Sequence, residues 1–523
     1  MTLWRSGAAF AMAAAIAALG SPAPAQPKSE LTIALAAEST TMDPTRYSAG
    51  VDQYFIGNMF EQLVKPDPEG KLVNWLAESW EITEVDGKPV IDVRIRPGVT
   101  FHNGDPLTAA DFEFSYQRLK DPNISRWSHM QAAVERFEII DDLHFRLHFS
   151  KGDAAYVASF LQLWAIPMNY IAEVGDEGFN ENPIGTGPWR FVSRKVKEEL
   201  VLDRYEGYWN QEHQPGADRL VIKIIPEDLT RVAALKTGEV DWIDAVPPAM
   251  LADVEAMEGI ETTSRVSGNN LFLDMDTIPE DSPFRDQRVR QAVAYGIDID
   301  AIIESVLFGQ GERYQEVGEG SAGYDPDLEP YPYDPAKAMQ LLAEAGYPNG
   351  LDVDCYNLIT PREPNVKEMG EAMFAYLSAI GVRCRLQNLE YSAWINLGRR
   401  AEDTPQLNGG LLSWMWGQGV PGDPGVAWGG HVHSYEPGKG WGSYSHASDP
   451  ELDRMIEEAN EMMDPAARNE ALKAIGRRKH EMVLGGLTTY MPLVTFAWRA
   501  DKVDFTPWPH PGYWRNFQEI GVK

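Results

Sequence analysis

Residues 351–390 decide the fold class, and they read LDVDCYNLITPREPNVKEMGEAMFAYLSAIGVRCRLQNLE. The segment 351–355 alternates apolar and polar residues with period two, as a half-buried strand does. The stretch 367–380 has a helical pattern that ends at Gly381, and a second strand pattern follows at 382–387. A strand, a helix and a strand in this order predict parallel pairing in a mixed sheet with helices on its faces. The fold class is therefore α/β.

Other parts of the chain show the same two periodicities. Residues 90–95 and 141–149 alternate as strands do, whereas 288–295 and 336–345 place their apolar residues on one helical face. The second of these helices is followed by Gly346 and, two residues later, by a proline, which is a strong stop signal. The chain shows no fixed-period repeat and no long flexible linker, so we expect one compact assembly.

The two cysteines, Cys355 and Cys384, exclude a small scaffold held together by disulfides. Each lies in a short alternating segment, with its sulfur on the same side as the apolar residues. An oxidising compartment would allow one disulfide between neighbouring strands. Two buried free thiols are the alternative, because the sequence does not supply the geometry that a bridge needs.

The first 25 residues have the parts of a secretory signal peptide. A basic start at Arg5 precedes a short apolar run over residues 8–19, and an Ala-x-Ala ending predicts cleavage after Ala25. The run is shorter than the roughly 20 residues of a membrane span. No cysteine lies at the cleavage point, so we expect an exported, periplasmic protein without a lipid anchor.

The length and charge of the chain limit its partners. A chain of 523 residues with 44% hydrophobic residues fills two or three domains. The formal net charge of −32 argues against nucleic acid and against anionic membrane surfaces, which attract basic patches. The simplest explanation of this charge is a solvated, self-repelling surface.

Four segments form a pattern that is specific as a set. They are LAESW at 76–80 with VRIRPGVTFHNGDPLTAAD at 93–111, NPIGTGPW at 182–189, RVAALKTGEVD at 231–241 and SPFRDQRVRQA at 282–292. In their order, spacing and coverage they resemble the family 5 extracellular solute-binding proteins, the oligopeptide-, dipeptide- and nickel-binding group. Within the second segment, 185–187 lacks the Lys-Ser/Thr of a phosphate-binding loop, so we expect a structural turn there.

The resemblance implies a two-lobed periplasmic binding protein, with an extra domain on one lobe and a ligand cleft between the lobes. Carried over by motif position, lobe 1 combines residues 29–57, 182–272 and 485–523, the extra domain covers 58–181, and lobe 2 covers 273–484. The crossovers near 269–274 and near 484–489 are the expected hinges.

The ligand site expected from the resemblance centres on residues 413–424, SWMWGQGVPGDP. In peptide-binding relatives this segment carries an acidic residue that pairs with the α-ammonium of the peptide. Gly419 or Val420 stands at that place here, so Asp423 is the acidic candidate, from a shifted loop.

Tryptophans and asparagines complete the predicted site. Trp414, Trp416 and Trp428 offer flat apolar surface to a ligand, with ordinary core packing as the alternative for each. Asn269 and Asn270, at the predicted crossover, have amides that suit ligand backbone groups, or else cap the crossover turn itself.

The histidines near this segment suggest a metal site. His431 and His433 are two positions apart, so they can share a face if the segment is extended, and His446 follows nearby. A stable site needs three or four ligands, so we predict solvent-exposed loop histidines, no metal and no cofactor.

The sequence therefore predicts the solute-binding protein of an ABC importer, which closes over a peptide-like solute and delivers it to an inner-membrane permease. A sugar, an opine or an aromatic compound is the alternative solute. We predict no catalytic residues, because strings such as Gly-x-Ser-x-Gly or His-Glu-x-x-His are absent from the sequence. An exported hydrolase and a non-transport sensor or chaperone are the competing classes. The family implies a monomer.

Overall fold

The structure is a computed structural model of the chain. It describes residues 29–47, 50–67, 72–125, 128–131, 133–154, 163–267, 269–314, 316–360, 365–400, 407–417, 423–436, 442–507 and 516–523. The predicted signal peptide lies outside these residues. Among the described helices, none is both long and apolar enough to cross a membrane.

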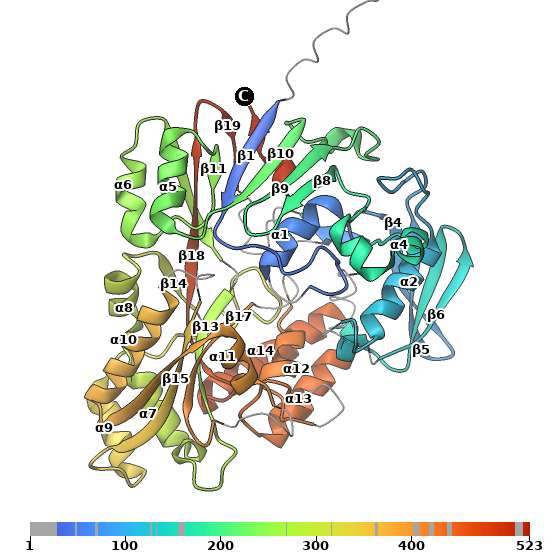
Figure 1. The fold of residues 1–523 in the computed structure, drawn as a ribbon. Coiled ribbons are helices and arrows are strands. Elements are labelled where there is room, and N and C mark those ends of the chain that lie inside the picture. The colour runs from blue at the N-terminus through green and yellow to red at the C-terminus, as the bar shows by residue number, and fades with distance from the viewer. Residues whose placement is uncertain are drawn as a thin grey trace, which may run out of the picture.

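One large mixed sheet runs through two lobes, in the order β16-β15-β17-β13-β18-β11-β1-β10-β9-β8 (Figure 1). The first lobe contains β1 (Glu30–Leu35), β8 (Trp189–Lys195), β9 (Glu199–Arg204), β10 (Arg219–Ile224), β11 (Trp242–Ile243) and β12 (Ile260–Val266). The second lobe contains β13 (Asn269–Met275), β14 (Gly311–Arg313), β15 (Leu351–Ile359), β16 (Val382–Glu390) and β17 (Leu411–Gly417). The long strand β18 (Leu487–Arg499) belongs to both.

Helices cover both faces of the first lobe. In β1, Leu31, Ile33 and Leu35 pack toward α1 (Gly50–Met59), whereas Ala34 packs toward α5 (Asp228–Thr237) and α6 (Leu251–Glu255). This alternation places successive side chains of one strand in two separate apolar cores.

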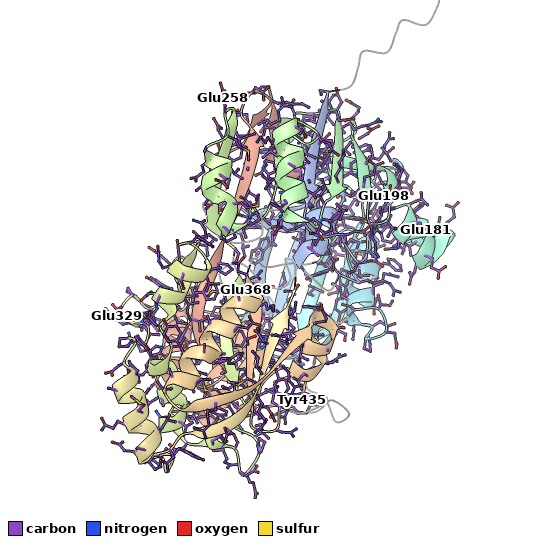
Figure 2. The ribbon with its side chains drawn as sticks, turned by 60° about the vertical axis from the view of Figure 1, so that its left-hand side comes forward. Glu181, Glu198, Glu258, Glu329, Glu368 and Tyr435 are labelled. Carbon is purple, nitrogen blue, oxygen red and sulfur yellow. A yellow bond between two sulfur atoms is a disulfide. The ribbon has the colours of Figure 1, made fainter. Side chains whose placement is uncertain are left out.

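The second lobe has the same layered construction. Its main core joins the sheet to α7 (Gln287–Gly296), α8 (Ile299–Val306), α9 (Pro335–Glu344), α10 (Val366–Ala379) and α11 (Tyr391–Gly398). A smaller core joins α12 (Gly425–His431), α13 (Pro450–Glu461) and α14 (Pro465–Met482). Figure 2 shows the two lobes in a second view, with Glu258 and Glu198 on the first lobe and Glu329 and Glu368 on the second. These four glutamates are exposed, as expected for a solvated acidic surface.

A separate four-stranded sheet forms the extra domain. Its order is β4 (Ala77–Val85), β5 (Lys88–Ile95), β7 (His144–Phe149) and β6 (Val134–Asp141), and its strands pair antiparallel. It packs against α2 (Ala109–Lys120), and it is flanked by α4 (Met168–Glu181) and by the hairpin of β2 (Val64–Pro66) and β3 (Leu72–Asn74). The sheets do not by themselves define where each lobe and the extra domain begin and end in the sequence, so the predicted residue ranges of these three parts stay a prediction.

The predicted α/β class and the parallel unit at 351–390 are confirmed. β15 and β16 pair in parallel from Leu351 opposite Val382 onward, and α10 connects them. Cys355 and Cys384, on these two strands, form a disulfide with their Cα atoms 5.3 Å apart. The sequence left open a disulfide or two buried free thiols, and the structure contains the disulfide.

The lobes join where two neighbouring strands change partners. β12 pairs with β18 as far as Val266 opposite Leu493, and β13 begins at Asn269 within the second-lobe part of the sheet. On β18, pairing with second-lobe strands extends to Pro492. On the first connection, the change from first-lobe to second-lobe pairing lies between Val266 and Asn269, just before the predicted hinge 269–274. On β18 the change lies at residues 492–493, after the predicted hinge 484–489. β18 continues through the joint unbroken, so no break in the sequence marks it.

Candidate functional site

Three of the predicted site residues meet at the joint between the lobes. β13 and β17 pair antiparallel, so that Asn270 lies opposite Trp416 and Asn269 lies opposite Gly417. Asn269 is half-buried, and its backbone N–H donates to Ser267 Oγ at 3.1 Å. The strand ends thus present polar groups at the point where the chain passes between lobes. The side chain of Trp416 and residues 418–422, with Gly419 and Val420, lie outside the described part of the chain.

Trp414 lies inside the second lobe. Its side chain is buried, and its ring centroid lies 4.3 Å from that of Trp394. A Cβ atom placed on Gly398 would come within 1.7 Å of the Trp414 ring, so this glycine makes room for the indole. Trp428 is likewise buried, in the small core of α12 to α14. Both tryptophans pack as core residues, and their predicted contact with a ligand stays a prediction.

Asp423 is paired with a buried cation. Its carboxylate accepts bidentate hydrogen bonds from the guanidinium of Arg468 on α14, with Nη2 to Oδ1 at 3.0 Å. The same carboxylate accepts the backbone N–H of Gly425 at 2.8 Å, at the start of α12. A ligand ammonium would have to compete with this guanidinium, so the structure gives Asp423 a positioning role between α12 and α14.

The prediction of solvent-exposed histidines is wrong. His431, His433 and His446 are 7%, 0% and 2% exposed. The ring of His431 lies 5.9 Å from that of Phe272 and 5.2 Å from that of Tyr444. Burial lowers the pKa of His431 and of His446 to about 3, which keeps both imidazoles neutral at pH 7.

Two of the sequence motifs hold each other together. His102, from the segment 93–111, lies against the turn 185–187: Gly185 N–H donates to Nδ1 at 3.2 Å, and Nε2 lies 2.9 Å from the carbonyl oxygen of Gly187. The carbonyl can only accept, so Nε2 carries the proton. A Cβ atom on Gly185 would lie 2.1 Å from the Met59 carbonyl oxygen, which explains the glycine there. The segment 185–187 is thus a packed structural turn, as expected.

A residue that the sequence did not reveal anchors the same turn. Glu61 is buried between the extra domain and the first lobe, and its carboxylate accepts hydrogen bonds from four neutral donors. These are Trp75 Nε1 at 2.6 Å, Tyr208 Oη at 2.8 Å, Trp209 Nε1 at 2.9 Å and Thr186 Oγ1 at 2.9 Å. The donors are spread over more than 130 positions of the sequence, so no local signal pointed to Glu61.

A family model covers most of the chain, including the predicted ligand segment 413–424. The model of the bacterial extracellular solute-binding proteins, family 5, matches residues 71–436. The chain belongs to this family.

The family 5 chain resembles curated relatives over part of their length. It is 34% identical to Heme-binding protein A of Haemophilus influenzae over 375 residues, which is 66% of each chain. It is 29% identical to Glutathione-binding protein GsiB of Pectobacterium atrosepticum over 344 residues, which is 65% of each chain. Each match spans slightly less than two thirds of the relative.

Solved structures share the fold over almost the whole chain. AgaA from A. tumefacien R10, in complex with agropinic acid, superposes with a TM-score of 0.79 at 22% identity, covering 94% of this chain and 99% of AgaA. DppA from Helicobacter pylori, in complex with the peptide STSA, has a TM-score of 0.77 at 21% identity, covering 95% and 98%. The two-lobed architecture of this family 5 protein is therefore that of the periplasmic binding proteins.

In this family 5 protein, the extra domain touches the second lobe. Lys151 Nζ lies 2.6 Å from Glu461 Oε1, at the end of α13. Next to it, Gly152 packs so closely that a Cβ atom would lie 2.4 Å from the Glu461 carbonyl oxygen. Lys151 suits the C-terminal end of a helix, where the partial charge is negative.

His102 makes the stability of this family 5 protein depend on pH. Burial lowers the pKa of His102 to about 4 from an ordinary value of 6.5. The unfolded chain therefore binds the proton first, and stability is lost as pH falls from 6.5 through 4. The loss from His102 alone is about 3 kcal/mol.

Urea unfolding of wild type and His102→Gln between pH 7 and pH 4 checks this expectation. The variant lacks the titrating ring, so the difference in unfolding free energy between the two proteins should shrink toward pH 4. A difference that stays constant over this range would contradict the assignment.

Proposed function

We propose that this family 5 protein is the solute-binding component of an ABC importer, exported by residues 1–25 and free in the periplasm. The observation that carries the proposal is the joint, where two adjacent strands connect two separately packed lobes. Such a joint permits closure by small backbone changes at a few residues. A solute that contacts both lobes would stabilise the closed state, which an inner-membrane permease then recognises.

A peptide-like solute is the first candidate. The polar strand ends at Asn269, Asn270 and Gly417 offer amide and backbone groups that match those of a peptide. The curated relative GsiB is named for glutathione, and DppA was solved with a peptide, which supports this class.

A solute without a free α-ammonium is the second candidate. The observation in its favour is the pairing of Asp423 with Arg468, which leaves this carboxylate engaged. AgaA was solved with agropinic acid, and the relative from Haemophilus influenzae is named for heme. Both ligand classes therefore belong in the same screen.

A thermal-shift screen of the mature chain separates the candidates. The probes are glutathione, the peptide Ser-Thr-Ser-Ala, agropinic acid, heme and a panel of sugars. A ligand at 100 times its dissociation constant adds about 2.7 kcal/mol to the folded state, which raises the melting temperature by several degrees. A shift with either peptide supports peptide binding, and a shift confined to another class overturns it. No shift with any probe would contradict both candidates.

Closure should depend on the contact at Gly152. In Gly152→Ala the added methyl group meets a backbone oxygen, so we expect the extra domain and the second lobe to separate and the radius of gyration in solution scattering to rise. Gly430→Ala is the matched control, because a Cβ atom there has no neighbour within 4 Å. Lys151→Ala should have less effect, since an exposed ion pair contributes about 0–1 kcal/mol. Equal scattering from Gly152→Ala and Gly430→Ala would contradict a role in closure.

A further inference from the structure

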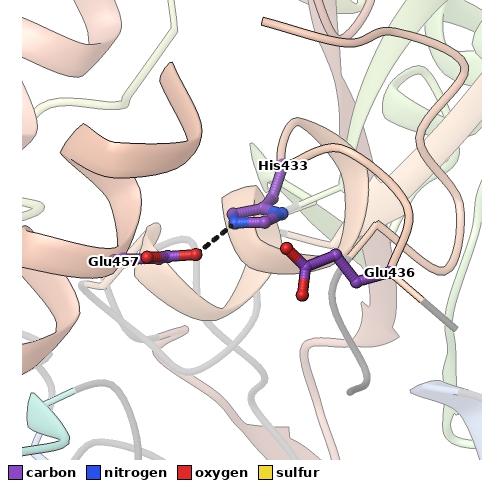
Figure 3. Close-up of side chains that lie close together, drawn as sticks. All are labelled: His433, Glu436 and Glu457. Atoms are coloured by element: carbon purple, nitrogen blue, oxygen red, sulfur yellow. Dashed lines mark hydrogen bonds and ion pairs between the residues drawn. The ribbon is translucent and has the colours of Figure 1, made fainter. Parts of the chain in front are cut away.

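A cluster of metal-ligating side chains lies in the second lobe, outside the segment 413–424. His433 follows α12, Glu436 comes three residues later, and Glu457 lies on α13 (Figure 3). One ligand atom from each of the three residues lies within 4.8 Å of the other two. The cluster thus brings one nitrogen and two oxygen ligands together from two elements of the chain.

The hydrogen bonding of His433 fixes which nitrogen faces the cluster. Its side chain is fully buried, and Nδ1 lies 2.8 Å from the carbonyl oxygen of Ser434. A carbonyl oxygen only accepts, so Nδ1 carries a proton and donates it. Nε2 lies 3.0 Å from Glu457 Oε1 (Figure 3). In the neutral ring, Nε2 therefore presents a lone pair to a carboxylate oxygen.

Two acceptors at this distance need a positive charge between them. A proton on Nε2 would supply this charge, and so would a divalent cation bound by the neutral imidazole and Glu457. A further carboxylate, Asp453, lies 3.8 Å from Nδ1 and adds negative charge. Within the described ranges, no lysine or arginine pairs with Glu457. With Glu436 completing the set, two carboxylates beside the neutral imidazole form a ligand set for a divalent cation.

The separation of the ligand atoms also fits a metal ion. Two ligand atoms that each lie about 2.1 Å from a metal are about 3.0 Å apart in octahedral geometry and about 3.4 Å apart in tetrahedral geometry, and Nε2 and Glu457 Oε1 are 3.0 Å apart. A metal-binding histidine commonly donates its other ring N–H to a backbone carbonyl, which orients the ring. The bond from Nδ1 to Ser434 supplies this arrangement.

We propose that His433 Nε2, Glu457 and Glu436 bind one divalent first-row transition metal ion. Imidazole with carboxylates suits zinc, nickel, cobalt or manganese better than calcium or magnesium. The ion would connect the segment after α12 to α13, whose last residue contacts the extra domain. This inference goes beyond the proposed function and does not depend on the imported solute.

Equilibrium dialysis of the mature, tag-free chain against zinc chloride at pH 7.5 tests the proposal. We expect one zinc ion per chain, with binding weakened at least about tenfold in Glu457→Gln and in His433→Gln. Glu458→Gln is the matched control on the same helix, where the native carboxylate pairs with Arg454 on the surface, and it should bind zinc as wild type does.

The choice of variants distinguishes a loss of zinc binding from a loss of folding. His433 is buried, so His433→Gln is compared only if its melting curve shows a cooperative transition. The Glu457 side chain is 44% exposed, and its replacement leaves the core intact. Zinc binding that is absent from wild type, or that is equal in Glu457→Gln and Glu458→Gln, would overturn the proposal. A nitrogen-15 spectrum with both His433 nitrogens protonated in the presence of saturating zinc would also overturn it.

Discussion

Glu61→Ala should lower the free energy of unfolding by at least about 4 kcal/mol, because it leaves three buried donors and one half-buried donor without an acceptor, each at a cost of about 1–3 kcal/mol. The donors come from Trp75, Thr186, Tyr208 and Trp209, so the loss reaches both the extra domain and the first lobe. Burial raises the pKa of Glu61 against the opposing effect of these donors, which shows how far the carboxylate is removed from water.

Urea unfolding of Glu61→Ala, Glu61→Gln and Glu84→Ala measures this effect. The amide of Glu61→Gln keeps one oxygen but turns an NH₂ group toward a donor, so it should also destabilise the protein. Glu84 is exposed on β4, and its replacement should change the unfolding free energy by no more than about 0.5 kcal/mol. Unfolding of Glu61→Ala at the same urea concentration as Glu84→Ala would rule out the anchoring role.

Asp423→Ala should destabilise the second lobe by about 3–5 kcal/mol, because it leaves the guanidinium of Arg468 buried and unpaired. The Arg468 side chain is only 6% exposed. Replacing both partners should cost less than the sum of the single changes, since no charge then remains unpaired. Differential scanning calorimetry of the two single variants and the double variant measures the coupling.

A surface pair supplies the control for this prediction. Arg454 and Glu458 are each 53% exposed, so Glu458→Ala should change stability by no more than about 1 kcal/mol. If Asp423→Ala melted like Glu458→Ala, the pairing with Arg468 would not be structural. A loss of ligand binding in Asp423→Ala is evidence of a direct contact only after its stability has been taken into account.

The family motifs were readable in the sequence, but their contacts with one another were not. The segments 93–111 and 182–189 each predict a turn from their glycines, prolines and asparagines. His102 and the turn 185–187 meet only in the folded chain, where two backbone groups fix the protonation of the ring. Residues this far apart leave no common periodicity, so pattern analysis treats them as independent.

The predicted ligand site also combines features that the sequence predicted with features that it did not. Asn269 and Asn270 were expected at a crossover and Trp416 in the ligand segment, and the pairing of β13 with β17 brings the three residues together. The burial of Trp414 and of the histidines depends on which helices cover the sheet. A tryptophan or a histidine has the same local sequence signal in a core and on a ligand surface.

The sequence by itself determined the α/β class, the parallel unit at 351–390 and the family, because these follow from local periodicity and from ordered motifs. Only the tertiary structure decided the bridge between Cys355 and Cys384, the place where β18 passes between lobes and the partners of Glu61 and Asp423. Each of these depends on distances between segments far apart in the chain. Local patterns record which side of a strand or helix is apolar, and they do not record which distant group lies against it.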